Sequence, residues 1–489
     1  MDAIVIRGGL RLAGEVEVGG AKNAALPILF ASLLTPGTCR IRNVPKVVDC
    51  VTTERLLEQL GVEVEPNQDG SVVLAARNIT SFEAPYDLVK TMRASFLALG
   101  PLLARFGEAR VATPGGCAIG SRPVNIHLAA FEQMGASIHH SHGYVEARAP
   151  RGSDGRPRLR GAHITFEMPS VGATENVMMA ASLASGTTII DNAAREPEIV
   201  DLADMLRAMG ALIHGDGTST ITVEGREALG GCSHTVVPDR IEAGTFLMAV
   251  AAAGGDVVVN GARAEHLSAA IELLRRAGVG IDELPGAVRV RSDRRLRAVD
   301  VRTAPHPGFP TDLQAQMMAL MCFAEGASKI TETIFENRFM HVQELVRMGA
   351  DIRIDGHTAV VHGGGPLEGA PVMATDLRAS VCLVVAALGA SNTTELQRVY
   401  HLDRGYERLE QKLAGLGADI ERVRERPTEA TSASHAAQGE DDARPARAPA
   451  GARPPGFHPV EAPAGAHAVA APGPIALVQA PGRRPTAGS

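Results

Sequence analysis

The sequence contains no tryptophan, and aromatic residues make up only 3% of its 489 residues. Stacking of nucleic-acid bases on tryptophan is therefore excluded, and the net charge of −7 argues against a general nucleic-acid binder. The apolar run at residues 381–388 is far shorter than the ~20 residues that a helix needs to cross a bilayer. We therefore expect neither a nucleic-acid partner nor a membrane partner.

The cysteines are few and scattered, without any C-x-x-C pair: Cys39, Cys50, Cys117, Cys232, Cys322 and Cys382. This usage is typical of a reduced protein and not of a disulfide scaffold. The first seven residues lack a basic segment and a long apolar segment, so we expect no signal peptide. Together these features predict a cytoplasmic protein.

Motifs for common cofactors are also missing. The sequence has no Walker A loop, and no dinucleotide fingerprint follows an expected strand. His139, His140 and His142 form a histidine-rich patch, but they lack ordinary ligand spacing and cysteine partners. We therefore expect no metal and no cofactor.

The chain repeats itself six times. In each copy a helix-like segment is followed by a glycine and then by alternating residues, and the glycines lie 68 to 75 residues apart: Gly61, Gly135, Gly210, Gly278, Gly349 and Gly417. A glycine suits the position just past a helix, and alternation indicates a half-buried strand. A second pattern of an alanine-rich helix, a small turn and a strand alternates with the first. Six such units predict an α/β repeat architecture, divided most simply into two domains of three units.

The repeats stop at about residue 424. Residues 425–489 are rich in alanine, proline, glycine, serine and arginine, without apolar periodicity. This composition predicts a disordered tail.

The stretch at residues 113–123 carries Cys117 in a glycine-rich loop, with Arg122 five residues later. Flanking glycines disfavour a packed helix or strand, and a nearby guanidinium lowers a thiol pKa from its usual ~8.5. This arrangement is typical of a catalytic lid, whereas most single cysteines are simply small buried apolar residues.

Several cations fall at loop-like ends of the repeats: Lys22, Arg93, Arg122, Arg338, Arg378 and Arg404. Each alone is most simply a surface charge or an ion-pair partner. As a set they can converge on one cleft, and such a cluster is what a phosphate ester needs. Asp312, in a proline-rigid loop before a helix, is either a helix-start acid or a base for a substrate hydroxyl.

These motifs resemble a known family. Segments 19–23, 114–124, 170–176, 193–198, 308–316, 331–341 and 403–408 are similar to those of the UDP-N-acetylglucosamine 1-carboxyvinyltransferases, enolpyruvyl transferases of peptidoglycan precursor synthesis. The resemblance spans residues 1 to about 424, in order. It implies two inside-out, barrel-like α/β domains, each of three units in a pseudo-threefold arrangement. One domain comprises residues 22–236, and the other combines residues 1–21 with 237–424.

The resemblance also implies a reaction. The enolpyruvyl group of phosphoenolpyruvate moves to the 3′-hydroxyl of UDP-N-acetylglucosamine, and phosphate is released. Cys117 matches the proton donor that also forms a covalent adduct, and Asp312 matches the residue near the attacking hydroxyl. The remaining matches are of three kinds. Lys22, Arg122 and Arg404 match phosphate and carboxylate binders, Arg338 and Arg378 match further site cations, and Asn23, Arg93, Pro123, Val124, Asn125, Ile126 and Ile334 match positions lining the sugar-nucleotide site.

A cysteine at position 117 further implies sensitivity to fosfomycin, an epoxide that alkylates this thiol. We expect a monomer that needs no cofactor. Two alternatives stay open: a related enzyme acting on shikimate 3-phosphate, and a sugar-nucleotide sensor that has lost catalysis. The cysteine loop and the Asp312 loop argue against the first, and the complete set of acid, base and cations argues against the second.

Overall fold

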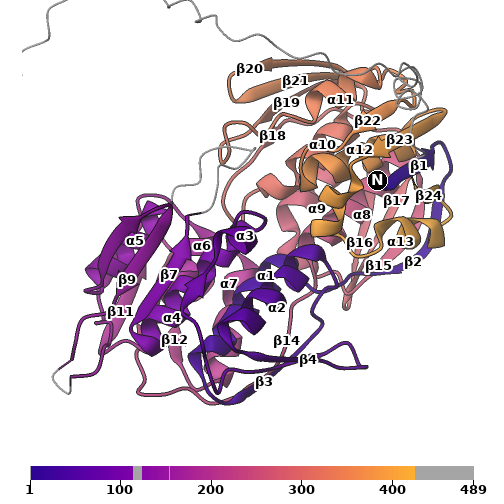
Figure 1. Ribbon diagram of the computed structural model, residues 1–489. Coiled ribbons are helices and arrows are strands. Elements are labelled where there is room, and N and C mark those ends of the chain that lie inside the picture. The colour runs from indigo at the N-terminus through magenta and orange to yellow at the C-terminus, as the bar shows by residue number, and fades with distance from the viewer. Residues whose placement is uncertain (1, 114–123, 153–154, 425–489) are drawn as a thin grey trace, which may run out of the picture. The chain divides into compact units, whose positions relative to one another are not determined.

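The computed structural model describes residues 2–113, 124–152 and 155–424. The predicted tail at 425–489 and the glycine-rich loop at 114–123, with Cys117, therefore lie outside the described residues. The fold is mixed α/β and contains six four-stranded sheets of the same design (Figure 1). In each sheet a parallel pair is extended by two antiparallel strands, so every sheet is open and none of the described strands closes a barrel.

Three sheets are built from residues 38–235. In sheet order they are β14 (Cys232–Thr235), β3 (Thr38–Arg42), β5 (Val72–Ala75) and β4 (Glu63–Pro66); β6 (Glu83–Ala84), β7 (Glu108–Ala112), β9 (Tyr144–Arg148) and β8 (Ser137–Ser141); and β10 (His163–Thr165), β11 (Thr187–Asp191), β13 (Thr220–Glu224) and β12 (Leu212–His214). The last strand along this part of the chain, β14, pairs with the first, β3, which ties its two ends together.

The other three sheets combine the N-terminal strands with the later part of the chain. They are β16 (Gly280–Leu284), β17 (Ala287–Ser292), β15 (Gly255–Asn260) and β2 (Leu12–Glu17); β18 (Val301–Arg302), β19 (Gly326–Thr331), β21 (Thr358–Gly363) and β20 (Asp351–Asp355); and β22 (Pro371–Met373), β23 (Thr393–Gln397), β1 (Asp2–Arg7) and β24 (Asp419–Arg424). Strands β1 and β2 thus complete two sheets whose other strands follow residue 254.

The six repeated glycines end six helices, as the sequence predicts. The helices are α2 (Val48–Leu60), α5 (Asn125–Gln133), α7 (Pro197–Ala208), α9 (Ser268–Arg276), α11 (Val342–Arg347) and α13 (Leu409–Gly415). Each glycine follows its helix by one or two residues and has a φ between 90° and 102°. Side chains rarely adopt this left-handed conformation, which explains why glycine recurs at the end of each helix.

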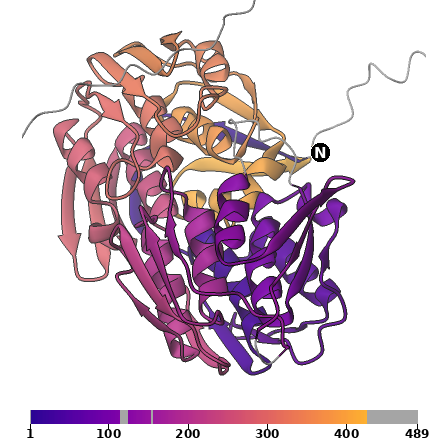
Figure 2. The ribbon, with the colours of Figure 1, turned by 90° about the vertical axis from the view of Figure 1, so that its left-hand side faces the viewer.

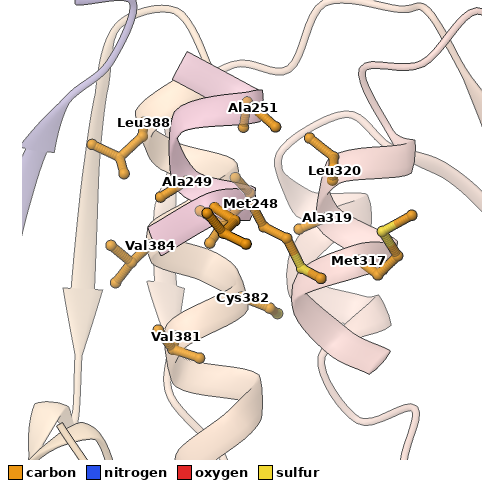
Figure 3. Close-up of a cluster of buried hydrophobic side chains, with 14 of the residues drawn as sticks. Met248, Ala249, Ala251, Met317, Ala319, Leu320, Val381, Cys382, Val384 and Leu388 are labelled. Atoms are coloured by element: carbon orange, nitrogen blue, oxygen red, sulfur yellow. The ribbon is translucent and has the colours of Figure 1, made fainter. Parts of the chain in front are cut away.

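The alanine-rich segments form six further helices, which are apolar on nearly all sides and buried: α1 (Lys22–Ala31), α4 (Leu99–Phe106), α6 (Val171–Ala181), α8 (Arg240–Ala253), α10 (Gln314–Met321) and α12 (Leu377–Gly389). A helix that is apolar all round belongs in a protein core. Figure 3 shows α8, α10 and α12 packed together, with small or flexible side chains such as Met248, Ala319 and Cys382 between them. Short helices α3 (Tyr86–Val89), η1 (Ser32–Leu34), η2 (Arg93–Ala98), η3 (Ala264–His266), η4 (Thr311–Leu313) and η5 (Val399–Arg404) complete the fold.

The buried apolar side chains form two separate clusters. One contains residues from Ala21 to Val237, and the other combines residues from Ile4 to Val18 with residues from Ile241 to Ile420. Figures 1 and 2 show the corresponding elements gathered in two groups, and Figure 1 shows the indigo strands β1 and β2 among the pink to orange elements that follow residue 240.

The chain passes between the two clusters twice, and the two passages pair with each other. Gly20 and Pro238 form an antiparallel bridge, the Ala21 N–H donates to the Val237 carbonyl at 2.7 Å, and the Asp239 N–H donates to the Gly19 carbonyl at 2.8 Å. Helices α1 and α8 begin directly after these passages. The first residues of both helices are therefore held close together.

Candidate functional site

Charged side chains gather where the buried helices begin. Lys22 and Asn23 open α1, Arg378 lies in the first turn of α12, and Asp312 lies in η4 just before α10. Two side chains cap the helices beside this region, because Asp239 accepts hydrogen bonds at the start of α8 and Asp376 does so at the start of α12. Helix N-termini carry partial positive charge, so their convergence favours a bound anion.

Asp312 is the centre of the first charge cluster. Its carboxylate accepts a hydrogen bond from Arg338 Nη2 at 2.8 Å and one from Arg378 Nη2 at 2.8 Å. The Asn23 amide approaches the same carboxylate at 3.5 Å. Both arginine side chains are only 6% exposed, and the Asp312 side chain is 23% exposed. The structure thus brings together four of the residues that the sequence predicts for the site.

The environment of Asp312 keeps it ionised. Burial by itself would raise the pKa of this carboxyl, but the charges of Arg378 and Arg338 and their hydrogen bonds hold the pKa well below its usual value. An ionised carboxylate can accept a proton, and the pairing with two arginines makes it a weak base. Its basicity would rise if another anion drew one arginine away.

Asp49 is the centre of a second charge cluster, which the sequence analysis missed. Its carboxylate is paired with Lys22 Nζ at 3.1 Å and with Arg404 Nε at 3.0 Å. The Asp49 side chain is 5% exposed, so it depends on both cations for compensation. The one signal in the sequence is an acid flanked by Val48 and Cys50 in the first turn of α2, which places a charge among apolar neighbours.

The two clusters are joined through adjacent residues of α1. The Lys22 side chain contacts Asp49 and the Asn23 side chain contacts Asp312. Two consecutive residues of α1 therefore link the two carboxylates. The backbone N–H of Lys22 also approaches the Asp239 carboxylate at 3.4 Å, which ties the start of α1 to the cap of α8. Arg404 and Asp312 adjoin one apolar cluster, whereas Lys22, Asn23 and Asp49 adjoin the other. The site therefore forms where the chain passes between the two clusters.

Glu332 supports the turn that carries Asp312, and the sequence analysis did not predict this role. It is 1% exposed and accepts hydrogen bonds from Thr303, from Thr311 and from the N–H of Ile334. Thr311 in turn accepts a hydrogen bond from Arg338 at 2.8 Å. Ile334 is therefore placed beside the Asp312 cluster through the backbone of its loop.

The remaining predicted residues lie on η2 and at the start of α5, or outside the described part. Arg93 begins η2, and His127 in α5 has a pKa of about 3 because of burial and the charge of Arg93. Val124, Asn125 and Ile126 form the start of α5, and among the described contacts none joins these three to Asp49 or Asp312. Cys117, Arg122 and Pro123 lie outside the described residues.

The cations of the site are suited to binding anions. Asp49 and Asp312 are each paired with two of the four cations Lys22, Arg338, Arg378 and Arg404. Cations gathered in this way attract phosphate and carboxylate groups, and guanidinium groups bind them in a bidentate manner. Among the residues that the structure describes, no group of three or more histidine, cysteine, aspartate or glutamate side chains is arranged to hold a metal ion. No described helix has the length and apolar character needed to span a membrane.

Comparison with known proteins identifies the family. The sequence pattern of the EPSP synthase family (3-phosphoshikimate 1-carboxyvinyltransferase) matches residues 6–413, which include both charge clusters. The chain belongs to this family. A curated relative from Geotalea uraniireducens (strain Rf4), named UDP-N-acetylglucosamine 1-carboxyvinyltransferase, is 57% identical over 426 residues, which are 87% of this chain and 100% of the relative. A protein of the same name from Anaeromyxobacter sp. (strain K) is 58% identical over the same shares.

Solved structures of the family share the fold. The enolpyruvyl transferase NikO from Streptomyces tendae superposes with a TM-score of 0.77 at 28% sequence identity, covering 86% of this chain and 99% of that one. EPSP synthase from Acinetobacter baumannii superposes with a TM-score of 0.67 at 19% identity, covering 87% and 100%. The mixed α/β architecture is therefore that of the enolpyruvyl transferases, as the sequence predicts.

Proposed function

We propose that this protein is a UDP-N-acetylglucosamine 1-carboxyvinyltransferase of peptidoglycan precursor synthesis. It transfers the enolpyruvyl group of phosphoenolpyruvate to the 3′-hydroxyl of UDP-N-acetylglucosamine and releases phosphate. The observation that carries the proposal is the joined pair of charge clusters around Asp49 and Asp312, in which the residues around Asp49 and Asp312 itself are ones that the sequence predicts for this reaction. Relatives of this name at 57% and 58% identity, matched over their whole length, support the choice of substrates.

The two clusters suit the two halves of the reaction. Lys22 and Arg404 are the cations for the phosphate and carboxylate of phosphoenolpyruvate, and Arg122 belongs with them. Such positive groups stabilise the charge that develops as phosphate leaves. Asn23, Arg93, Ile334 and residues 123–126 line the sugar-nucleotide site, and Cys117 delivers the proton to carbon 3 and forms the covalent adduct.

Asp312 is the group that takes the proton of the attacking hydroxyl. Its pairing with Arg338 and Arg378 fixes the direction of the carboxylate and keeps it ionised before substrate binds. A general base must be ionised and must lie within hydrogen-bond reach of the proton it removes. Arg338 and Arg378 therefore position the base and also tune its pKa.

We also propose the domain arrangement that the sequence analysis predicts, with inside-out domains at 22–236 and at 1–21 with 237–424. The two apolar clusters and the paired passages at Gly20 and Pro238 support it. A cytoplasmic monomer that works without nucleic acid, membrane or cofactor stays a prediction. A mass measurement by light scattering tests the monomeric state.

The first prediction concerns phosphate release. We expect inorganic phosphate to form from phosphoenolpyruvate when UDP-N-acetylglucosamine is present and not when it is absent. Release with shikimate 3-phosphate in place of the sugar nucleotide would instead establish the related enzyme. Binding of the sugar nucleotide without phosphate release, in a protein that melts cooperatively, would establish the sensor.

The second prediction concerns Cys117. We expect fosfomycin to inactivate the enzyme with time and to add one adduct mass, which peptide mass spectrometry places on Cys117. The Cys117→Asp variant is expected to resist inactivation, because a carboxylate does not open the epoxide as a thiolate does. The Cys232→Ser variant is the matched control, since Cys232 is half-buried in β14 and should leave inactivation unchanged. Full activity after prolonged excess fosfomycin would contradict the role of Cys117.

A further inference from the structure

A buried phenol lies directly behind the Asp312 cluster. Tyr406 is 3% exposed and follows η5 by two residues. Its oxygen lies 3.2 Å from Arg378 Nη1, 2.9 Å from Thr245 Oγ1 and 3.4 Å from Gln316 Nε2. These three partners come from α12, α8 and α10, the three buried helices that pack together in the apolar cluster of residues 4–18 and 241–420.

The hydrogen bonds of Thr245 determine the direction in which the phenol proton of Tyr406 points. Thr245 Oγ1 donates its single proton to the Ile241 carbonyl at 2.7 Å. The contact between Thr245 and Tyr406 therefore requires the phenol to donate and the threonine to accept. This leaves the lone pairs of the phenol oxygen for Arg378, whose guanidinium can only donate. Burial raises the pKa of Tyr406, so the phenol keeps its proton at neutral pH.

Arg378 is held at two of its nitrogens. Nη1 donates to Tyr406 at 3.2 Å, and Nη2 donates to the Asp312 carboxylate at 2.8 Å. A guanidinium is planar and rigid, so a contact that fixes one nitrogen also fixes the direction of the other. Gln316 adds a second link, because its Nε2 donates to the Asp312 backbone carbonyl at 3.0 Å and approaches the phenol.

We propose that Tyr406 is a positioning residue of the reaction: its phenol oxygen orients Arg378, and Arg378 orients the Asp312 carboxylate toward the attacking hydroxyl. The inference rests on the proposed function, in which Asp312 takes the hydroxyl proton. Tyr406 itself does not touch Asp312 in any described contact, so it acts through the arginine.

The other charges that face this network come from neighbouring elements. Arg338, in the loop before α11, pairs with Asp312. The charge of Asp312 also raises the pKa of Arg240 at the start of α8. The charge of Asp239 raises the pKa of both Arg378 and Tyr406. Glu332 reaches the cluster through Thr311. None of these groups has a described hydrogen bond to the phenol oxygen, so we expect them to stay in place when that oxygen alone is removed, and a change in the pH profile then reports on Arg378.

The test is the Tyr406→Phe variant, which removes one oxygen and keeps the ring. We expect kcat to fall by about 10-fold, the ratio that corresponds to ~1.4 kcal/mol, with little change in the KM of phosphoenolpyruvate. We also expect the acidic limb of the kcat profile to move to higher pH by at least ~0.5 unit. The sign follows from charge, because a loosened Arg378 lowers the pKa of Asp312 less, and the base is then protonated at a higher pH.

Two matched variants separate positioning from stability. Thr245→Val removes the hydroxyl that accepts the phenol proton and leaves the contact between Arg378 and Tyr406, so it should lower the melting temperature without moving the acidic limb. Tyr400→Phe alters a half-exposed tyrosine of η5 that stacks on His401. It should change neither the melting temperature nor the acidic limb of the kcat profile.

Each outcome has one meaning. A Tyr406→Phe variant with the kcat and the acidic limb of the wild type overturns the inference while the proposed function stands. An equal shift of the limb in Thr245→Val also overturns it, because the effect would then be structural. A wild-type protein without sugar-dependent phosphate release contradicts the proposed function and the inference together.

Discussion

The Asp312→Asn variant is expected to lose kcat by a factor of about 10²–10⁴, the usual contribution of a general base. An amide oxygen can still accept a hydrogen bond from one arginine, but the amide nitrogen faces the other arginine as a second donor. We therefore expect the variant to fold, with a loss of about 1–3 kcal/mol in the free energy of unfolding from one unpaired buried donor. Steady-state kinetics and denaturant unfolding measure the two effects separately.

The pH dependence of this stability loss has a defined sign. The folded pKa of Asp312 is lowered, so its stabilising effect is complete above the unfolded pKa of about 3.9 and is lost only as the pH falls through the folded value. The difference in unfolding free energy between wild type and Asp312→Asn should therefore be constant from pH 5 to pH 8. A difference that changes within this range would show that Asp312 titrates there, contrary to the geometry.

The control for Asp312 is another arginine–aspartate pair. Asp256 accepts hydrogen bonds from Arg289 at 2.8 and 2.7 Å on an exposed face of β15. Asp256→Asn removes a comparable pair far from the helix N-termini, and exposed pairs contribute at most ~1 kcal/mol. We expect its kcat to equal that of the wild type. If Asp312→Asn also kept the wild-type kcat, Asp312 would not be the base.

The Asp49→Asn variant is expected to lower kcat by about 100-fold. Lys22 and Arg404 share the Asp49 carboxylate, and without its charge neither cation keeps its present direction. A displacement of about 1 Å in a group that binds the reacting molecule is enough for a 10²-fold loss. The measurement is kcat together with the KM of phosphoenolpyruvate, because the two possible roles of Asp49 affect these constants differently.

If Asp49 positions the two cations, kcat falls and the KM of phosphoenolpyruvate does not improve. If Asp49 only competes with the substrate for Lys22 and Arg404, its removal lowers the KM and leaves kcat intact, which would contradict the prediction. Asp87→Asn serves as the matched control. Asp87 pairs with Lys90 at 2.6 Å, but its side chain is 86% exposed, so we expect no kinetic effect.

Local chemistry made much of the fold predictable. The six glycines that end helices were visible because a left-handed residue is common just past a helix, and each one has a positive φ. The alanine-rich helices were visible because they are apolar on all sides. Asn23, Arg338 and Arg378 were predicted for the site from their motifs, and the structure places these three around the Asp312 carboxylate. Lys22, also predicted, contacts Asp49 instead.

The residues that the sequence did not reveal depend on long-range burial. Asp49 looks like an ordinary first-turn acid, and Glu332 looks like one more surface charge. Each becomes significant only when the fold buries it against cations or backbone N–H groups.

The sequence by itself determined the repeat, the helix ends, the family and most of the cations, because these depend on backbone conformation and on short motifs. Only the tertiary structure decided which charges meet. Asp49 pairs with Arg404 across 355 residues, and Thr245 meets Tyr406 across 161. No local pattern records such partners, because a side chain's electrostatic role is set by what the rest of the chain places against it once water is excluded.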